Sequence, residues 1–140
     1  MVGAARVIHH VLTWALVAGV ALQIFLAGLG VFAGAANFAT HRDFGYLLEL
    51  LPVLILVAAA VGRLGRRQII TPLVIFGLFI LQSVFVALRE STPALAALHP
   101  VNGFIIAYLA VQLAREAWAR SRSGTQTPVS SHAAYEAPGS

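Results

Sequence analysis

The chain has 140 residues, of which 59% are hydrophobic and 10% charged, and its formal net charge is +4. This composition excludes an ordinary soluble domain and a chain of two domains, and it predicts a membrane protein. The positive charge comes from nine arginines that flank apolar runs instead of forming a stripe with interleaved aromatic residues, so no nucleic acid is expected as a partner. The chain contains no cysteine, which excludes disulfides and thiolate metal sites.

Four apolar stretches are long enough to cross a bilayer as helices, which takes about twenty residues because no water inside the bilayer satisfies unpaired backbone groups. They cover residues 7–32, 44–61, 69–88 and 101–118. The fold expected is an all-α membrane protein, a bundle of four transmembrane helices within residues 1–120. Residues 121–140 are rich in Ser, Thr, Pro and Gly, and this composition predicts a disordered cytoplasmic tail.

The arginines predict the orientation, because positively charged loops are retained in the cytoplasm. With four helices, both termini and the middle connection lie on one side, which carries seven arginines: Arg6, Arg63, Arg66, Arg67, Arg115, Arg120 and Arg122. The other side carries only Arg42 and Arg89. We therefore expect a multi-pass protein of the bacterial inner membrane with cytoplasmic N- and C-termini. An alternative is a cleaved signal peptide ending near residues 33–36, but the apolar segment is about twice the usual length of a signal core.

The sequence looks like an internal repeat of one two-helix unit. The segments His41-x-x-x-Gly45 and His99-x-x-x-Gly103 each precede or open a predicted apolar span. Parallel repeats related by an axis along the membrane normal place equivalent residues at equal depth on opposed helices. The repeat therefore predicts a bundle of two parallel-repeated helix hairpins, in which His41 and His99 meet near the outer face.

Two imidazoles suit one kind of cofactor better than others. A zinc site usually needs three or four protein ligands, whereas two histidines complete the axial coordination of a haem iron that already has four porphyrin nitrogens. We therefore expect His41 and His99 to be the metal ligands of one bis-histidine b-type haem. Such a haem has no open coordination position, which favours electron transfer over oxygen chemistry. Gly45 and Gly103 would let a flat ligand approach the helices, or would serve small-residue helix packing.

The haem propionates would need cations or water, and Arg42 and Arg89 are the arginines on that side. Arg42 is equally well explained as a solvated loop charge. Gln23 and Gln82 lie eighteen and seventeen residues before the two histidines. Polar groups in such apolar surroundings bond across helices, so both are expected to be structural, with contact to the cofactor as the alternative.

Glu49 is the acidic residue well inside a predicted span, which makes it a candidate functional residue. It would relay a proton, or be protonated and hydrogen-bonded to Gln23 or Asn102. His9 and His10 lie at the inner end of the first helix, where no other histidine of a predicted span lies at the same depth. A second bis-histidine site is therefore not expected.

Two resemblances add to this interpretation. The element His99-Pro100-Val101-Asn102-Gly103 (HPVNG), with residues 23–28 and the first His-x-x-x-Gly, resembles a family of small bacterial four-helix membrane proteins of undescribed function over about residues 7–118. More distantly, the organisation resembles one four-helix half of haem A synthase. In that family one histidine on the second helix and one on the fourth ligate a haem near the outer face, which implies the same role for His41 and His99.

The departures from haem A synthase imply haem binding more than catalysis. That enzyme has two such halves and an acidic residue in an outer loop of its catalytic half. Here the first outer loop, residues 33–40, has no carboxylate, and Asp43 follows the histidine. A homodimer would restore eight helices.

The function expected from the sequence is a cytochrome b-like protein that exchanges electrons with a quinone or a partner protein. If it is an enzyme, it is a membrane oxidoreductase. The alternative is a small transporter working through Glu49, or an assembly subunit, without haem.

Overall fold

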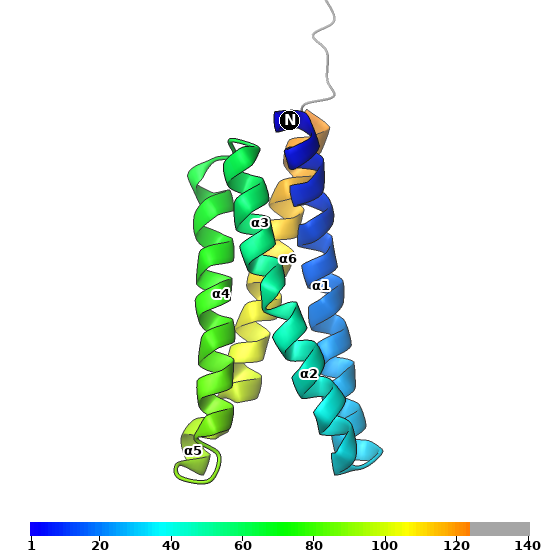
Figure 1. Cartoon of the computed structure of the whole chain (residues 1–140), viewed down its shortest axis with the longest axis vertical. Helices are drawn as coiled ribbons and strands as arrows, with labels where there is room; N and C mark the ends of the chain where they lie inside the picture. The colour runs from blue at the N-terminus through cyan, green and yellow to red at the C-terminus, as the bar shows by residue number, and fades with distance from the viewer. Residues whose placement is uncertain (124–140) are drawn as a thin grey trace, which may run out of the picture.

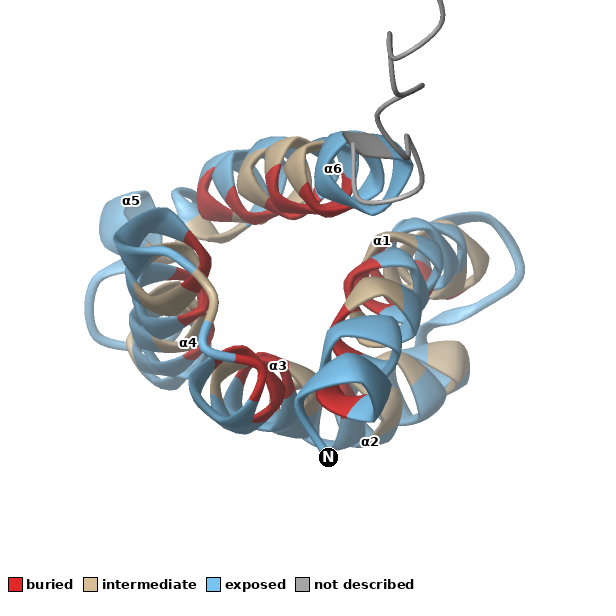
Figure 2. Ribbon diagram, turned by 90° about the horizontal axis from the view of Figure 1, so that it is seen from above, coloured by how far each residue is buried: buried red, intermediate tan, exposed pale blue. Residues whose placement is uncertain are grey.

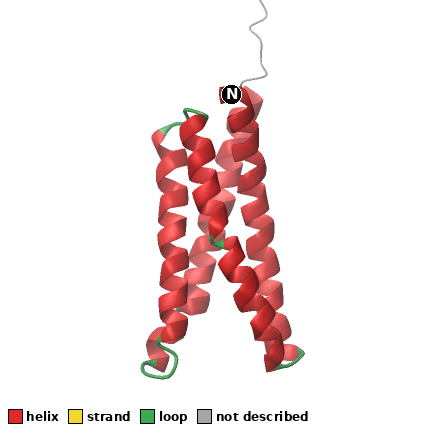
Figure 3. Cartoon of the chain, viewed as in Figure 1, coloured by secondary structure: helices red, strands yellow, loops and turns green. Residues whose placement is uncertain are grey.

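The computed structural model describes residues 1–123, and in this range it contains helices, turns and no strand (Figure 3). In chain order the elements are α1 (Val2–Phe32), the 3-10 turn η1 (Ala35–Asn37), α2 (Phe38–Leu48), α3 (Leu50–Val61), α4 (Arg66–Ala87), α5 (Pro93–Ala96) and α6 (His99–Ser123). Four helical segments are long and apolar enough to cross a membrane. The prediction of an all-α, four-helix membrane fold is confirmed.

The four long helices form a closed ring when the bundle is seen along its axis (Figure 2). Neighbouring pairs are α1 with α3, α3 with α4, α4 with α6, and α6 with α1. In this ring α4 lies opposite α1, and α6 lies opposite α3. Each helix of the second hairpin thus faces its counterpart in the first, as a two-fold repeat about the bundle axis requires.

The core is made where the four helices face one another. Leu16, Ile55, Ile75 and Leu113 come one from each long helix and are at most 1% exposed. Many large apolar side chains instead lie on the outside, including Phe104, which is 68% exposed. An apolar exterior around a packed apolar core matches a protein whose surroundings are lipid.

The second span is broken at Glu49, between α2 and α3. Pro52 has no N–H to donate to the carbonyl of Leu48 one turn earlier, and its ring crowds that carbonyl. The span therefore changes direction there, and α2 packs against α1 (Figure 1). The α1–α2 hairpin consequently diverges from α4 and α6 toward its turn.

Several boundaries differ from the sequence prediction. Residues 38–43 were expected in a loop but are helical, because no proline or glycine interrupts them. A short helix, α5, lies in the predicted loop 89–100. Residues 121–123, expected to be disordered, continue α6, where Arg120 and Arg122 stabilise the last turn through the helix dipole. The remainder of the predicted tail, residues 124–140, lies outside the described residues.

The bundle has two distinct ends, which we name by their side chains. The arginine-rich end comprises the start of α1, the 62–65 link with the start of α4, and the last turns of α6. The imidazole end comprises the turn between α1 and α2 and the connection from α4 to α6. Figure 1 shows these ends at opposite extremes of the long axis.

Candidate functional site

The structure brings the two repeated histidines together at the imidazole end. His41 lies in α2 and His99 is the first residue of α6. Their ring centroids are 6.1 Å apart, with an angle of 68° between the ring planes. Both rings are half-buried. The pair therefore joins the two hairpins, because α2 belongs to the first and α6 to the second.

Each imidazole is held through the same nitrogen. His41 Nδ1 lies 3.1 Å from the carbonyl oxygen of Gln23, and His99 Nδ1 lies 3.3 Å from the carbonyl oxygen of Gln82. A carbonyl oxygen only accepts hydrogen bonds, so Nδ1 carries the proton in both neutral rings and Nε2 keeps its lone pair. Metal-binding histidines are commonly oriented by such a bond to a backbone carbonyl.

The glutamines also support this arrangement with their side chains. Gln23 Nε2 donates to the carbonyl oxygen of His41 at 2.8 Å, so Gln23 and His41 are joined by two hydrogen bonds. The Oε1 atom of Gln82 accepts a hydrogen bond of 2.8 Å from Asn102 Nδ2. Both side chains therefore connect helices, in agreement with the structural role expected for them.

Gly45 and Gly103 make room for these glutamine amides. A Cβ atom at position 45 would lie 2.6 Å from Gln23 Nε2, and one at position 103 would lie 3.4 Å from Gln82 Nε2. The first approach is closer than a side chain tolerates. At least at position 45, glycine thus allows the histidine's partner to pack against the helix.

Asn102 is the supporting residue whose role the sequence reasoning missed. It is 5% exposed, and its Nδ2 donates to Leu78 O and Gln82 Oε1, both at 2.8 Å. The sequence feature that could have identified this role is the position of Asn102, three residues after His99 and within the HPVNG element. In the first repeat Phe44 occupies the corresponding place, so the two histidines are supported differently.

The ring separation suits a shared metal. A ring nitrogen lies about 1.1 Å from the ring centre for ring bonds of about 1.33 Å. With metal–imidazole bonds of about 2.0 Å, two imidazoles on opposite sides of one ion have centres about 6.2 Å apart. The observed 6.1 Å is close to this value. Residues 1–123 hold no group of three or more His, Cys, Asp or Glu side chains that could bind a metal ion without other donors.

Arg42 and Arg89 lie near this end but pair with their neighbours in sequence. Arg42 Nε is 2.8 Å from Asp43 Oδ1, and an Arg89 Nη atom is 3.2 Å from Glu90 Oε1. Both arginine side chains are more than half exposed. Neither contacts the imidazoles, and exposed pairs of this kind are weak, so both guanidinium groups remain available to another anion.

Glu49 lies at the break between α2 and α3 and is half-buried. Gln23 and Asn102, its expected partners, bond elsewhere. His9 is buried at the arginine-rich end, whereas His10 packs on Trp118 with ring centroids 5.4 Å apart. Within residues 1–123 these two histidines do not form a pair like that of His41 and His99.

Residues 23–88 match the profile of a family described as a family of unknown function (DUF6220). This segment is just under half of the chain, and it includes His41 but ends before His99. The search of curated proteins and the search of solved structures returned no match. The comparisons thus give a similarity for the end of α1 and for α2, α3 and α4, without naming an activity.

Proposed function

We propose that this protein binds one b-type haem through His41 and His99 and transfers electrons to or from a quinone or a partner protein. The observation that carries the proposal is the imidazole pair, with ring centroids 6.1 Å apart and each Nδ1 atom facing a backbone carbonyl. Both Nε2 atoms are thereby left as metal-binding nitrogens.

A planar cofactor suits this pair for two reasons. The pair supplies two nitrogens, which is the number of axial ligands that a porphyrin iron lacks. The two histidines also come from different hairpins, His41 from α2 and His99 from α6, so they would reach a cofactor from two sides. Cofactor sites in helix bundles are commonly built from facing side chains in this way.

The protein's own groups would orient and neutralise the cofactor. The carbonyls of Gln23 and Gln82 fix the rotation of the two rings, and Asn102 holds Gln82 in place. Arg42 and Arg89 are available to pair with propionates. The haem would supply a one-electron redox couple, and six-coordinate iron would exclude a substrate from the metal.

The proposal includes an orientation in the membrane. The seven arginines at the arginine-rich end support a cytoplasmic location for that end, because positive charge in short connections is retained there. The imidazole pair would then lie near the outer face of a bacterial inner membrane. This places electron exchange near that face, with a quinone in the bilayer or with a partner outside it.

The test is the absorption spectrum of the full chain purified from haem-replete cells. The expected result is a low-spin Soret band that His41→Ala and His99→Ala each abolish, while His10→Ala at the opposite end retains it. All variants are first compared by gel filtration to verify folding. A folded but colourless wild-type protein would refute haem binding, and a Soret band that survives both substitutions would refute these ligands.

A further inference from the structure

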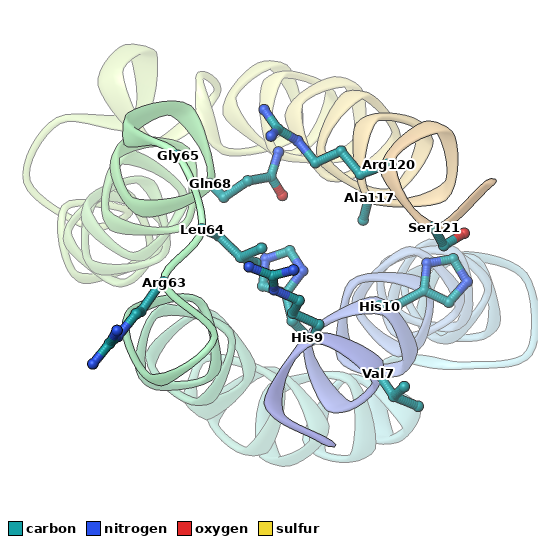
Figure 4. Close-up of a pocket in the computed structure, with 11 residues that line it drawn as sticks. Val7, His9, His10, Arg63, Leu64, Gly65, Gln68, Ala117, Arg120 and Ser121 are labelled. Carbon is teal, nitrogen blue, oxygen red and sulfur yellow. The ribbon is translucent and has the colours of Figure 1, made fainter. Parts of the chain in front are cut away.

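A second polar site lies at the arginine-rich end, unrelated to the imidazole pair. A cavity of about 590 Å³ is lined there by residues of α1, the 62–65 link, α4 and α6. Pockets that hold small molecules or headgroups have volumes of this order. Figure 4 views this cavity along the bundle axis.

Two fully buried polar residues at this cavity each have one side-chain atom without a hydrogen-bond partner. His9 is 1% exposed and its Nε2 has no hydrogen bond, while Gln68 is 0% exposed and its Oε1 has none. Gln68 Nε2 donates to Glu116 Oε2 at 3.0 Å, which fixes the amide, and Glu116 is paired with Arg67 at 3.0 Å. The amide oxygen of Gln68 thus faces the interior of the ring in Figure 4. Buried acceptors of this kind are normally satisfied by a donor, so this oxygen is a position at which a water molecule or a hydroxyl group of a bound molecule would donate.

Positive charge surrounds the same cavity. Arg6 Nε donates to the carbonyl oxygen of Gly62 at 3.0 Å, which ties this side chain to the 62–65 link. The Arg120 guanidinium nitrogens lie 3.7 and 3.8 Å from the position of a Cβ atom built at Gly65, so Arg120 reaches from α6 to the start of α4. Arg63 lines the cavity but points away from the centre of the ring in Figure 4.

The start of α4 adds to this positive field. The helix begins at Arg66 and has no side-chain cap, so the N–H groups of Arg66 and Arg67 lack a side-chain acceptor, while that of Gln68 donates to the carbonyl oxygen of Gly65 at 2.9 Å. The positive end of the helix dipole and these free N–H groups favour an anion. Glu116 is the carboxylate nearby, and its charge is balanced by Arg67.

We infer that this cavity binds a phosphate ester that also carries a hydroxyl group. The phosphate would lie between Arg6, Arg120 and the start of α4, because guanidinium groups and helix N-termini both bind phosphate oxygens. The hydroxyl would donate to Gln68 Oε1. The headgroup of a phosphoglycerol lipid and a free phosphate ester share this chemistry. Basic pockets between helices at this depth favour lipid headgroups, which makes the lipid the first source to test.

The experiment uses the full chain in detergent, exposed to equal amounts of phosphatidylglycerol, phosphatidic acid and phosphatidylcholine, with retained lipid measured by native mass spectrometry. Wild-type protein is expected to retain phosphatidylglycerol selectively. Arg6→Gln and Arg120→Gln should each reduce that retention about five-fold. Arg115→Gln is the matched control, since Arg115 is an exposed arginine of α6 that does not line the cavity.

A second variant tests the hydroxyl separately from the charge. Gln68→Met removes the acceptor, so it should abolish the preference for phosphatidylglycerol over phosphatidic acid and retain the preference of both over phosphatidylcholine. Binding of glycerol 3-phosphate that depends on Arg6 and Arg120, without lipid selectivity, would support the site and identify the free ester as its source. Equal retention of all lipids with no binding of the ester would overturn the inference, as would an equal loss in Arg115→Gln.

Discussion

Gly45 and Gly103 occupy matching positions four residues after the two histidines, yet alanine should have different effects at the two places. A Cβ atom at position 45 would lie 2.6 Å from Gln23 Nε2, whereas one at position 103 would lie 3.4 Å from Gln82 Nε2. The first contact requires the Gln23 amide to move, and the second is near ordinary van der Waals distance.

The expected magnitudes follow from two opposing terms. Replacing a helical glycine by alanine stabilises the helix by about 0.5–1 kcal/mol, because glycine loses more backbone entropy on folding. Gly103→Ala should retain this gain. In Gly45→Ala the displaced amide loses its hydrogen bond of 2.8 Å to the His41 carbonyl, which removes about 0.5–1.5 kcal/mol. The free energy of unfolding should therefore be nearly unchanged in Gly45→Ala and about 1 kcal/mol lower than in Gly103→Ala.

Reversible unfolding by sodium dodecyl sulfate in mixed micelles, followed by circular dichroism, measures this difference. If the proposed haem is present, Gly45→Ala should also lose pigment faster than Gly103→Ala, because Gln23 then no longer fixes His41. Equal stabilities for the two variants would show that the Gln23 amide does not occupy the space at position 45, and the account of how His41 is held would be wrong.

Three further predictions concern the supporting residues and the topology. Asn102→Leu should lower the free energy of unfolding by about 2 kcal/mol in the same assay, because it removes two hydrogen bonds, to Leu78 O and Gln82 Oε1, each worth about 1 kcal/mol; a change below about 0.5 kcal/mol would contradict this. Glu49→Gln should leave the Soret band unchanged, since the hydrogen bonds that hold the imidazoles do not include Glu49; a bleached protein would place Glu49 in the site. Because the chain has no cysteine, Ser91→Cys and Ala4→Cys can each be labelled singly. An impermeant thiol reagent on intact cells should modify position 91 and spare position 4, and the reverse pattern would refute the orientation.

The sequence by itself determined the fold class and the location of the repeated motif. Span number follows from the length of apolar runs, because a chain in lipid must satisfy its backbone groups within each helix. The matching spacings from Gln23 to His41 and from Gln82 to His99 predicted that the histidines lie at equal depth. These properties depend on neighbours along the chain, so they are readable without the tertiary structure.

Helix boundaries were less predictable from composition. The start of the second span lies at Phe38, so His41 lies within a helix and not at its end. Residues 38–43 are polar enough to suggest a loop, but they contain no proline or glycine that would end a helix. Composition alone was therefore compatible with a loop and with a polar helical turn. The break at Glu49 follows from Pro52, although whether a proline kinks a helix depends on what packs beside it.

Only the tertiary structure decided how the polar groups meet. The choice of Nδ1 as the protonated nitrogen depends on a carbonyl eighteen residues from His41 and on another seventeen residues from His99. The cavity beside His9 and Gln68 likewise joins residues of helices far apart in sequence. Such contacts are set by where helices cross and which side chains fill the space between them, and periodicity along one helix does not contain that information.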